Sequence, residues 1–129
     1  MRRSRVGLLL AVAFVGLVGC GGSSSPDLGI LRQLVGVWNL NGNTVDAGTT
    51  FTTPNKSFAY QFNNDSTWSN SNGEAGGFTL SGAVLTLFYT GSTTTSTFGV
   101  SFLDANTMRF VEYDSSLNPT AHGTRWVRQ

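Results

Sequence analysis

Cysteine, histidine and charged residues are all scarce in this sequence. Its 129 residues include one cysteine and one histidine, and only 12% of them are charged, about half the usual share. So few thiol and imidazole groups exclude an ordinary zinc site, and one cysteine cannot form a disulfide within the chain. Thr, Ser, Asn and Gly are abundant instead. This composition is typical of exported β proteins and disfavours a helical bundle, which needs Lys, Glu and Ala.

The excess of positive charge is confined to the first residues. Arg2, Arg3 and Arg5 account for three of the eight basic residues, so five basic residues remain against seven acidic ones, a net charge of −2. The rest of the chain therefore has no basic patch that could bind a phosphate backbone. We expect no nucleic-acid partner.

The first twenty residues are organised like an export signal. A basic segment, MRRSR, precedes thirteen apolar residues at 6–18. That run is shorter than the roughly 20 residues of a membrane-spanning helix and fits the apolar region of a secretory signal. The run ends in LVGC at Cys20, which resembles the lipobox of bacterial lipoproteins. The resemblance implies cleavage before Cys20, a diacylglyceryl group on its thiol and acylation of its new amine. The alternative is a stray or buried cysteine in an uncleaved anchor helix.

These features divide the chain into three parts: a lipoprotein signal peptide at 1–19, the lipidated cysteine with a Gly/Ser-rich flexible tether at 20–27, and a domain at 28–129. Several acyl chains on one cysteine would hold the protein permanently at a membrane, because a single chain binds only marginally. The resemblance implies a lipid-anchored protein of the cell envelope. In a Gram-negative source, Gly21 after the cysteine resembles the pattern for the outer membrane, on its periplasmic or surface side.

The pattern of apolar residues in the domain predicts one helical turn followed by strands. Leu28, Leu31, Leu34 and Val35 have helical spacing before Gly36. After them, apolar and polar residues alternate with period two, and turn signals recur every 8–12 residues.

We count about eight antiparallel strands, most of them joined by tight turns, which indicates an all-β, up-and-down arrangement. Such strands can form a sandwich or a closed barrel, and closure removes both unpaired edges. We expect strands of about six to eight residues. The side chains predicted to face inward are Trp38, Leu40, Phe58, Tyr60, Phe62, Trp68, Phe78, Leu80, Leu85, Leu87, Tyr89, Phe98, Val100, Phe102, Met108, Phe110 and Trp126.

The opening LVGVWNLNG resembles the G-x-W signature of the lipocalin and fatty-acid-binding-protein superfamily. There, a helical turn leads into the first strand, whose tryptophan closes one end of a barrel, and an arginine near the end of the last strand stacks on it. The resemblance implies these roles for Trp38 and for Arg128, which shares a strand face with Trp126. FNNDSTW, FTLSGAVLTL and LDANTM are similar to segments of small bacterial lipocalin-like domains, over residues 34–128. Full lipocalins are longer and have disulfides.

No group of residues in the sequence indicates a catalytic centre, a metal site or a cofactor. We interpret His122, between Ala and Gly, as solvated. We also interpret Asp104, Glu112 and Asp114 as a solvated surface near one turn, with Glu112 facing outward or lying at a rim. The segment GEAGG lacks the lysine and the strand–helix context of a phosphate loop. We therefore expect a protein that is not an enzyme.

The interior of the barrel decides between the remaining functions. An eight-stranded barrel is either filled by side chains or holds one small ligand, and the bulky inward set favours a filled interior or a shallow cavity. If a ligand binds, we expect a small hydrophobic or amphipathic molecule that contacts Tyr60, Trp68, Tyr89, Phe102 and Phe110. The alternative is a structural or protein-interaction module of the envelope with a filled barrel and no ligand.

Overall fold

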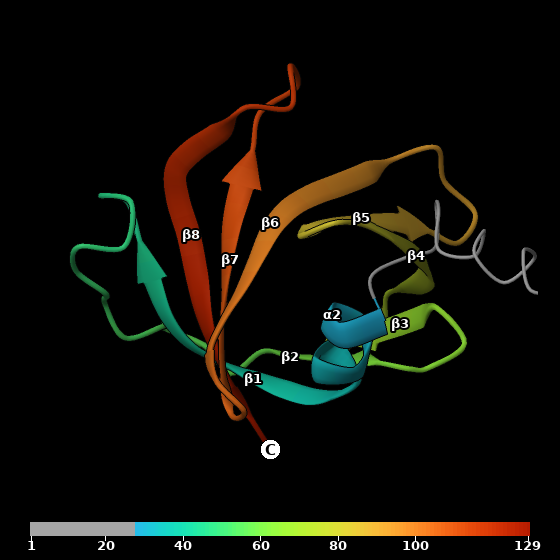
Figure 1. The fold of residues 1–129 in the computed structure, drawn as a ribbon, viewed down its shortest axis with the longest axis horizontal. Helices are drawn as coiled ribbons and strands as arrows, with labels where there is room; N and C mark the ends of the chain where they lie inside the picture. Colours follow the sequence, from blue (N-terminus) through green and yellow to red (C-terminus); the bar gives the residue numbers. More distant parts are fainter. Residues whose placement is uncertain (1–27) are drawn as a thin grey trace, which may run out of the picture.

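One short helix precedes a closed barrel. The computed structural model describes residues 28–129, in which eight antiparallel strands follow α2 (Leu28–Leu34) and pair in chain order, and β8 pairs with β1 (Figure 1). The predicted all-β, up-and-down barrel is confirmed, and the sandwich is excluded. The predicted signal peptide at 1–19, the predicted lipidation of Cys20 and the predicted tether at 20–27 lie outside the described residues. The strands are β1 (Gly36–Thr44), β2 (Ala59–Phe62), β3 (Thr67–Asn70), β4 (Ala75–Ser81), β5 (Val84–Tyr89), β6 (Thr95–Asp104), β7 (Thr107–Tyr113) and β8 (Pro119–Arg128).

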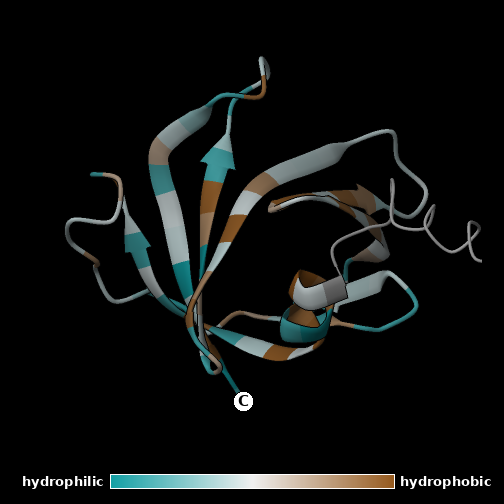
Figure 2. Ribbon diagram, in the orientation of Figure 1, coloured by the Kyte–Doolittle hydropathy of each residue, from teal (hydrophilic) through white to brown (hydrophobic). Residues whose placement is uncertain are grey.

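The alternation of apolar and polar residues along the strands produces the core. Successive side chains of a strand point to opposite faces, and Figure 2 shows apolar segments alternating with polar ones on β6 and β7. Every side chain predicted to face inward is either buried or packed against the buried cluster, which Leu34 of α2 completes. The buried hydrophobic residues are Leu34, Trp38, Tyr60, Phe62, Trp68, Phe78, Leu85, Leu87, Val100, Met108, Phe110 and Trp126.

The strands are less uniform than the expected six to eight residues. β2 and β3 have four residues each, whereas β6 and β8 have ten. Most connections are short, as predicted, but residues 45–58 form a long link from β1 to β2. The two long strands lie next to β7, so the wall formed by β6, β7 and β8 extends further than the wall of β2 and β3.

The link at 45–58 folds back onto the outer face of the barrel. Asn43 and Thr52 form an isolated antiparallel bridge. Phe51 then packs beneath Arg125, whose guanidinium carbon lies 4.3 Å from the centre of the ring. Arg125 also donates a hydrogen bond from Nε to the side-chain oxygen of Asn41, 2.8 Å away. The long link is thus attached to the strands beneath it.

Trp38 and α2 close one end of the barrel, which we call the closed end. The Trp38 ring is fully buried, and its Nε1 donates a 2.7 Å hydrogen bond to the Leu34 carbonyl. The last carbonyls of a helix have no partner within the helix, so this bond satisfies one of them. No helix among residues 28–129 is long and apolar enough to cross a membrane.

Arg128 ties β8 to the closed end. Its guanidinium carbon lies 4.3 Å from the Trp38 ring centre, so the contact expected between these two side chains is present. The same group donates hydrogen bonds to the carbonyls of Val35 at 2.8 Å and of Gln33 at 2.6 Å. Its Nε donates to the Ala105 carbonyl in the β6–β7 turn, 3.0 Å away. One side chain therefore joins the helix end, the first strand and the far turn.

Gly36 makes room for this arrangement. Its φ of +138° lies in a region that residues with a side chain rarely adopt, and a Cβ there would lie 2.5 Å from Nη1 of Arg128. A larger residue would add backbone strain and displace the guanidinium. The G-x-W segment thus needs a glycine at position 36, because a side chain there would displace the guanidinium that packs on Trp38.

Candidate functional site

We call the end of the barrel opposite α2 the mouth. Every second connection between the strands lies at this end. These connections are residues 45–58, 71–74, 90–94 and 114–118. Helix α2 precedes β1 and lies at the other end. Any molecule that enters along the barrel axis without displacing the closed-end contacts must therefore enter between these four segments.

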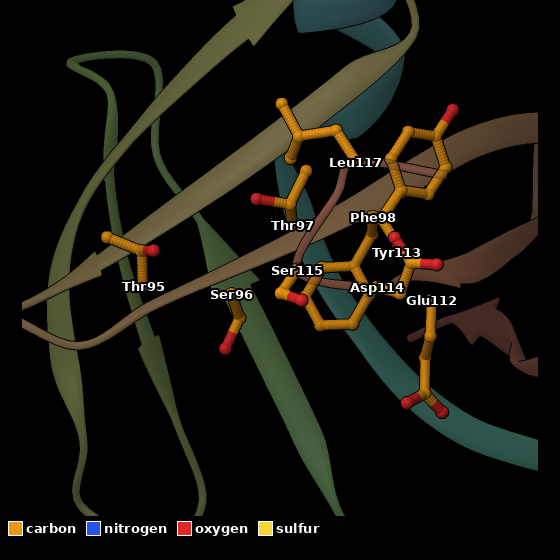
Figure 3. A pocket seen from close by; sticks show the side chains of 9 residues that line it. All are labelled: Thr95, Ser96, Thr97, Phe98, Glu112, Tyr113, Asp114, Ser115 and Leu117. Carbon is orange, nitrogen blue, oxygen red and sulfur yellow. The ribbon is translucent and has the colours of Figure 1, made fainter. Parts of the chain in front are cut away.

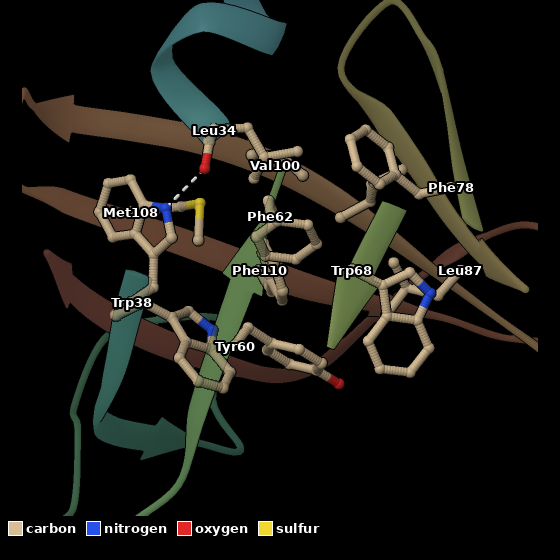
Figure 4. Packing of buried hydrophobic residues seen from close by; sticks show 12 residues of the cluster. Leu34, Trp38, Tyr60, Phe62, Trp68, Phe78, Leu87, Val100, Met108 and Phe110 are labelled. Carbon is tan, nitrogen blue, oxygen red and sulfur yellow. Dashed lines mark hydrogen bonds between the residues drawn. The ribbon is translucent and has the colours of Figure 1, made fainter. Parts of the chain in front are cut away.

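A cluster of aromatic rings fills the middle of the barrel below the mouth (Figure 4). Tyr60 lies at its centre, with its ring centre 5.1 Å from that of Trp126, 5.2 Å from Phe58, 5.4 Å from Phe62 and 5.7 Å from Trp68. Such separations are typical of tilted and edge-to-face aromatic pairs. The cluster forms the floor of the mouth.

A cavity of about 210 Å³ lies above this floor, and we call it the mouth cavity. Its walls come from β1, β2, β6, β7 and β8 and from the residue just before β2, and they are mostly aromatic. Trp126 Nε1 donates a 2.7 Å hydrogen bond to Oγ1 of Thr124, so the indole nitrogen is already paired. Glu112 is the one charged residue in the lining. The lining residues are Leu40, Phe58, Tyr60, Phe98, Phe110, Glu112, Thr124 and Trp126.

A larger and more polar hollow of about 530 Å³ lies beside the mouth cavity, between β6 and the β7–β8 turn. We call it the β6–β7 hollow. It shares Phe98 and Glu112 with the mouth cavity. These two residues form the first pair of the β6–β7 ladder, and beyond them the two strands separate. Figure 3 shows Phe98 and Glu112 on one side of the sheet, and Thr97 and Tyr113 on the other. The hollow therefore opens sideways from the cavity.

Glu112 lies at the rim of the barrel, on its inward side. We expected Glu112 to face outward or to lie at a rim. The rim position is confirmed. The outward position is wrong, because Glu112 follows Met108 and Phe110 at two-residue spacing on the inward face of β7. The side chain is exposed. Its backbone oxygen accepts a bond from Oγ1 of Thr120, but among the described residues no partner contacts its carboxylate.

The Tyr60 hydroxyl is a second unpaired polar group near the mouth. Tyr60 is only 7% exposed, and its hydroxyl makes no hydrogen bond to another described residue. Burial is the largest cause that raises the pKa of this phenol, followed by nearby Tyr89 and Glu74. The group therefore stays neutral and retains a proton to donate. A buried hydroxyl without a partner costs about 1–3 kcal/mol, a cost that a hydrogen-bonding guest would remove.

The structure brings together two of the five residues expected to contact a ligand. Tyr60 and Phe110 line the mouth cavity. Tyr89 lies beside a separate hollow of about 740 Å³ near the β5–β6 turn, and its hydroxyl is 3.1 Å from Oγ of Ser96. These residues were chosen from the alternation along the strands, which predicts only the face on which a side chain lies. All five do face inward.

The other two residues, Trp68 and Phe102, do not line the mouth cavity. Trp68 is 1% exposed, and its Nε1 donates to the carbonyls of Gly77 and Phe88 at 3.0 and 3.2 Å. Phe102 lies at the closed end, with its ring centre 6.0 Å from that of Trp38. Both side chains pack with the buried cluster, so neither of them lines the mouth cavity.

Sequence reasoning missed most of the cavity lining. Leu40, Phe58, Phe98 and Trp126 were expected to face inward but were not assigned to a site. For Glu112 a signal was present, because it has the same parity as Met108 and Phe110. Nothing in the alternation reports the height of a residue along the barrel axis, which depends on the register between strands.

The described residues contain no group of three or more His, Cys, Asp or Glu side chains that could hold a metal ion. His122 is exposed near the start of β8. Comparison of the chain with protein-family models, with curated proteins and with solved structures gave no match. The function therefore has to be argued from the barrel itself.

Proposed function

We propose that this chain is a lipid-anchored protein of the bacterial cell envelope whose lipocalin-like barrel binds one small hydrophobic or amphipathic molecule and catalyses no reaction. The observation that supports binding is the mouth cavity of about 210 Å³, walled by aromatic rings above a filled interior. Ligand sites are typically concave and mostly apolar, with a few polar groups that fix orientation. The lipobox-like LVGC segment, which ends at Cys20, supports the anchor.

A second candidate is a structural or protein-interaction module that holds no ligand. The filled lower barrel favours it, because the aromatic rings around Tyr60 leave the described interior occupied below the mouth. In that case the loops at the mouth would contact a protein partner. Filling the mouth cavity would then leave function unchanged, which separates the two candidates.

Binding is tested by a cavity-filling substitution with a matched control. Leu40 lines the mouth cavity, whereas Leu80 packs against the core on β4 and does not line it; both are half-buried. We expect Leu40→Phe to weaken binding of a neutral aromatic probe, such as toluene, at least tenfold, and Leu80→Phe to leave it within about twofold. Isothermal titration calorimetry measures both. Equal binding by the two variants would contradict the proposed site.

The anchor is tested separately by Cys20→Ser, with Ser24→Ala in the tether as the control. Lipid attachment requires the thiol, so we expect the serine variant to remain uncleaved or to be exported without lipid. Mass spectrometry of the membrane and soluble fractions reads both outcomes. A Cys20→Ser protein that is cleaved and still partitions fully with membranes would refute the lipobox interpretation.

A further inference from the structure

The mouth contains four acidic side chains, and Glu112 differs from the other three. The carboxylate of Asp46 accepts hydrogen bonds from Thr44 and Thr50. Asn70 donates a 2.9 Å hydrogen bond from Nδ2 to Oε1 of Glu74. The carboxylate of Asp114 accepts backbone N–H bonds of 2.9 and 3.0 Å from Ser116 and Asn118. These three carboxylates thus serve the turns in which they lie. The carboxylate of Glu112 has no partner among the described residues, and Glu112 alone of the four lines the mouth cavity.

Like the carboxylate of Glu112, the aromatic walls beside it favour a positively charged guest. Phe98 is stacked on Phe110, with ring centres 5.0 Å apart, and Trp126 lies 5.5 Å from Phe110. The faces of aromatic rings attract cations, tryptophan most strongly, and cages of such rings recognise quaternary ammonium groups. A carboxylate next to these rings adds a full negative charge, which attracts a cationic guest.

A neutral or anionic guest fits the cavity less well. A neutral apolar group would remove water from Glu112 without replacing it by an opposite charge, which is unfavourable. An anion would be repelled by it. The basic residues near this end do not line the mouth cavity: Lys56 lines a different hollow of about 430 Å³ beside Leu40 and Phe58, and Arg109 and Arg125 lie against Phe51 of the 45–58 link. The charge next to the aromatic walls is therefore negative.

The size of the cavity limits the apolar part of the guest. An apolar cavity of about 150 Å³ is enough to hold benzene, and pockets that enclose drug-sized ligands begin at about 300 Å³. At about 210 Å³, the mouth cavity has room for one ring with a small substituent. A longer polar portion would extend past Glu112 into the β6–β7 hollow, whose walls include Thr95, Ser96 and Ser115.

We propose that the mouth cavity selects a small organic cation, an amine or quaternary ammonium bearing one flat apolar ring, with the ring between the aromatic walls and the charged nitrogen at Glu112. This inference rests on the proposed function, because it names the class of ligand that the same cavity binds. It makes Glu112 the residue that determines specificity, and it leaves the aromatic rings to supply most of the affinity.

Three probes that share a benzyl group test the proposal. Benzyltrimethylammonium is the cation, neopentylbenzene is its neutral isostere with carbon in place of nitrogen, and phenylacetate is an anion. Isothermal titration calorimetry of the full chain in a nonionic maltoside detergent at fixed concentration measures each affinity. We expect the cation to bind about tenfold tighter than the neutral isostere, and the anion to bind most weakly.

Two substitutions assign the preference to one carboxylate. Glu112→Gln keeps the shape of the side chain but removes its charge, and we expect the cation and the neutral isostere then to bind within about twofold of each other. Asp114→Asn, two residues away at the same end, should retain the tenfold preference. Glu112 is exposed, and thermal unfolding of both variants verifies that they fold.

Each outcome bears on one of the two proposals. Equal binding of the cation and the neutral isostere to the unmodified chain overturns the cation inference but leaves ligand binding intact. Tighter binding of phenylacetate also overturns the inference, as does a cation preference that survives in Glu112→Gln. Binding of none of the three probes overturns the cavity as a ligand site, and with it the proposed function.

Discussion

The two ends of the barrel differ in how completely their polar groups are paired. At the closed end, the Trp38 indole and the Arg128 guanidinium together donate hydrogen bonds to four carbonyls. At the mouth, the Tyr60 hydroxyl and the Glu112 carboxylate have no partner among the described residues. Native proteins pair nearly all of their buried polar groups, so the unpaired hydroxyl of buried Tyr60 is unusual, whereas the Glu112 carboxylate is exposed to water. The polar groups of the closed end are thus used to hold the fold together, whereas those of the mouth are left without partners in the described residues.

The largest expected effect concerns the closed end itself. Trp38→Ala removes a fully buried ring, and a large-to-small change of this kind costs about 3–5 kcal/mol of unfolding free energy. Urea denaturation followed by circular dichroism measures it. Phe88→Ala is the control, because Phe88 is 44% exposed, and we expect it to cost under about 1 kcal/mol. Similar losses in the two variants would refute the structural role given to Trp38.

Arg128 and Arg125 provide a matched pair for the next effect. Each guanidinium carbon lies 4.3 Å from the centre of an aromatic ring, but Arg128 also donates to three carbonyls and Arg125 to one side chain. We expect Arg128→Met to lower the unfolding free energy by about 2–3 kcal/mol and Arg125→Met by under about 1 kcal/mol. Arg128→Lys should recover only part of the loss, because an ammonium lacks the planar fork. Denaturant midpoints that rank the two arginines equally would contradict the comparison.

Substitution of Gly36 and of Gly73 by alanine distinguishes the cost of backbone strain from the cost of steric contact. Both have positive φ, +138° and +86°, but a Cβ at Gly36 would meet Arg128, whereas a Cβ at Gly73 would meet nothing within 4 Å. We expect Gly36→Ala to cost about 2 kcal/mol and Gly73→Ala about 1 kcal/mol. In an Arg128→Met background the two costs should converge. A difference that persists there would mean that the contact with Arg128 is not its cause.

The smallest effect concerns Asp46, an acid near the mouth that is fully engaged, unlike Glu112. Hydrogen bonds from the Thr50 hydroxyl and backbone N–H, and then from Thr44, lower the pKa of Asp46 from 3.8 to about 2. Because the folded-state pKa is depressed, the stabilisation is fully present above pH 3.8 and is lost as the pH falls through about 2. Carboxyl carbon chemical shifts measure the titration. We expect Thr50→Val to raise the pKa of Asp46 and Thr53→Val to leave it unchanged.

Much of the barrel could be predicted from the sequence because strand alternation is a local property. The parity of Phe58, Tyr60 and Phe62 alone determines which face of β2 they share, and all three do pack inside. The contact between Trp38 and Arg128 was reached by a different route, through a resemblance in the G-x-W segment. Alternation could place both residues on inward faces, but it could not bring residues from the first and last strands together.

The candidate site was harder to predict because it depends on position along the axis. Phe102 and Phe98 have the same parity on β6, but Phe102 lies next to Trp38 and Phe98 lies at the mouth. The register of β6 against β7, together with the irregularity after Phe102, sets these heights. Phe51 is a further case, because its packing against Arg125 depends on a long link with no repeating pattern.

The closed-end contacts also determine when the fold can be completed. The bond from Arg128 to the Val35 carbonyl joins residues 93 positions apart, and contacts at such separation form slowly because a long loop must close first. Until β8 pairs with β1, two strand edges stay open and Trp38 lacks the guanidinium that covers it. Open edges promote aggregation. The interval in which open strand edges can pair with another chain therefore lasts until β8 pairs with β1, which also brings Arg128 onto Trp38.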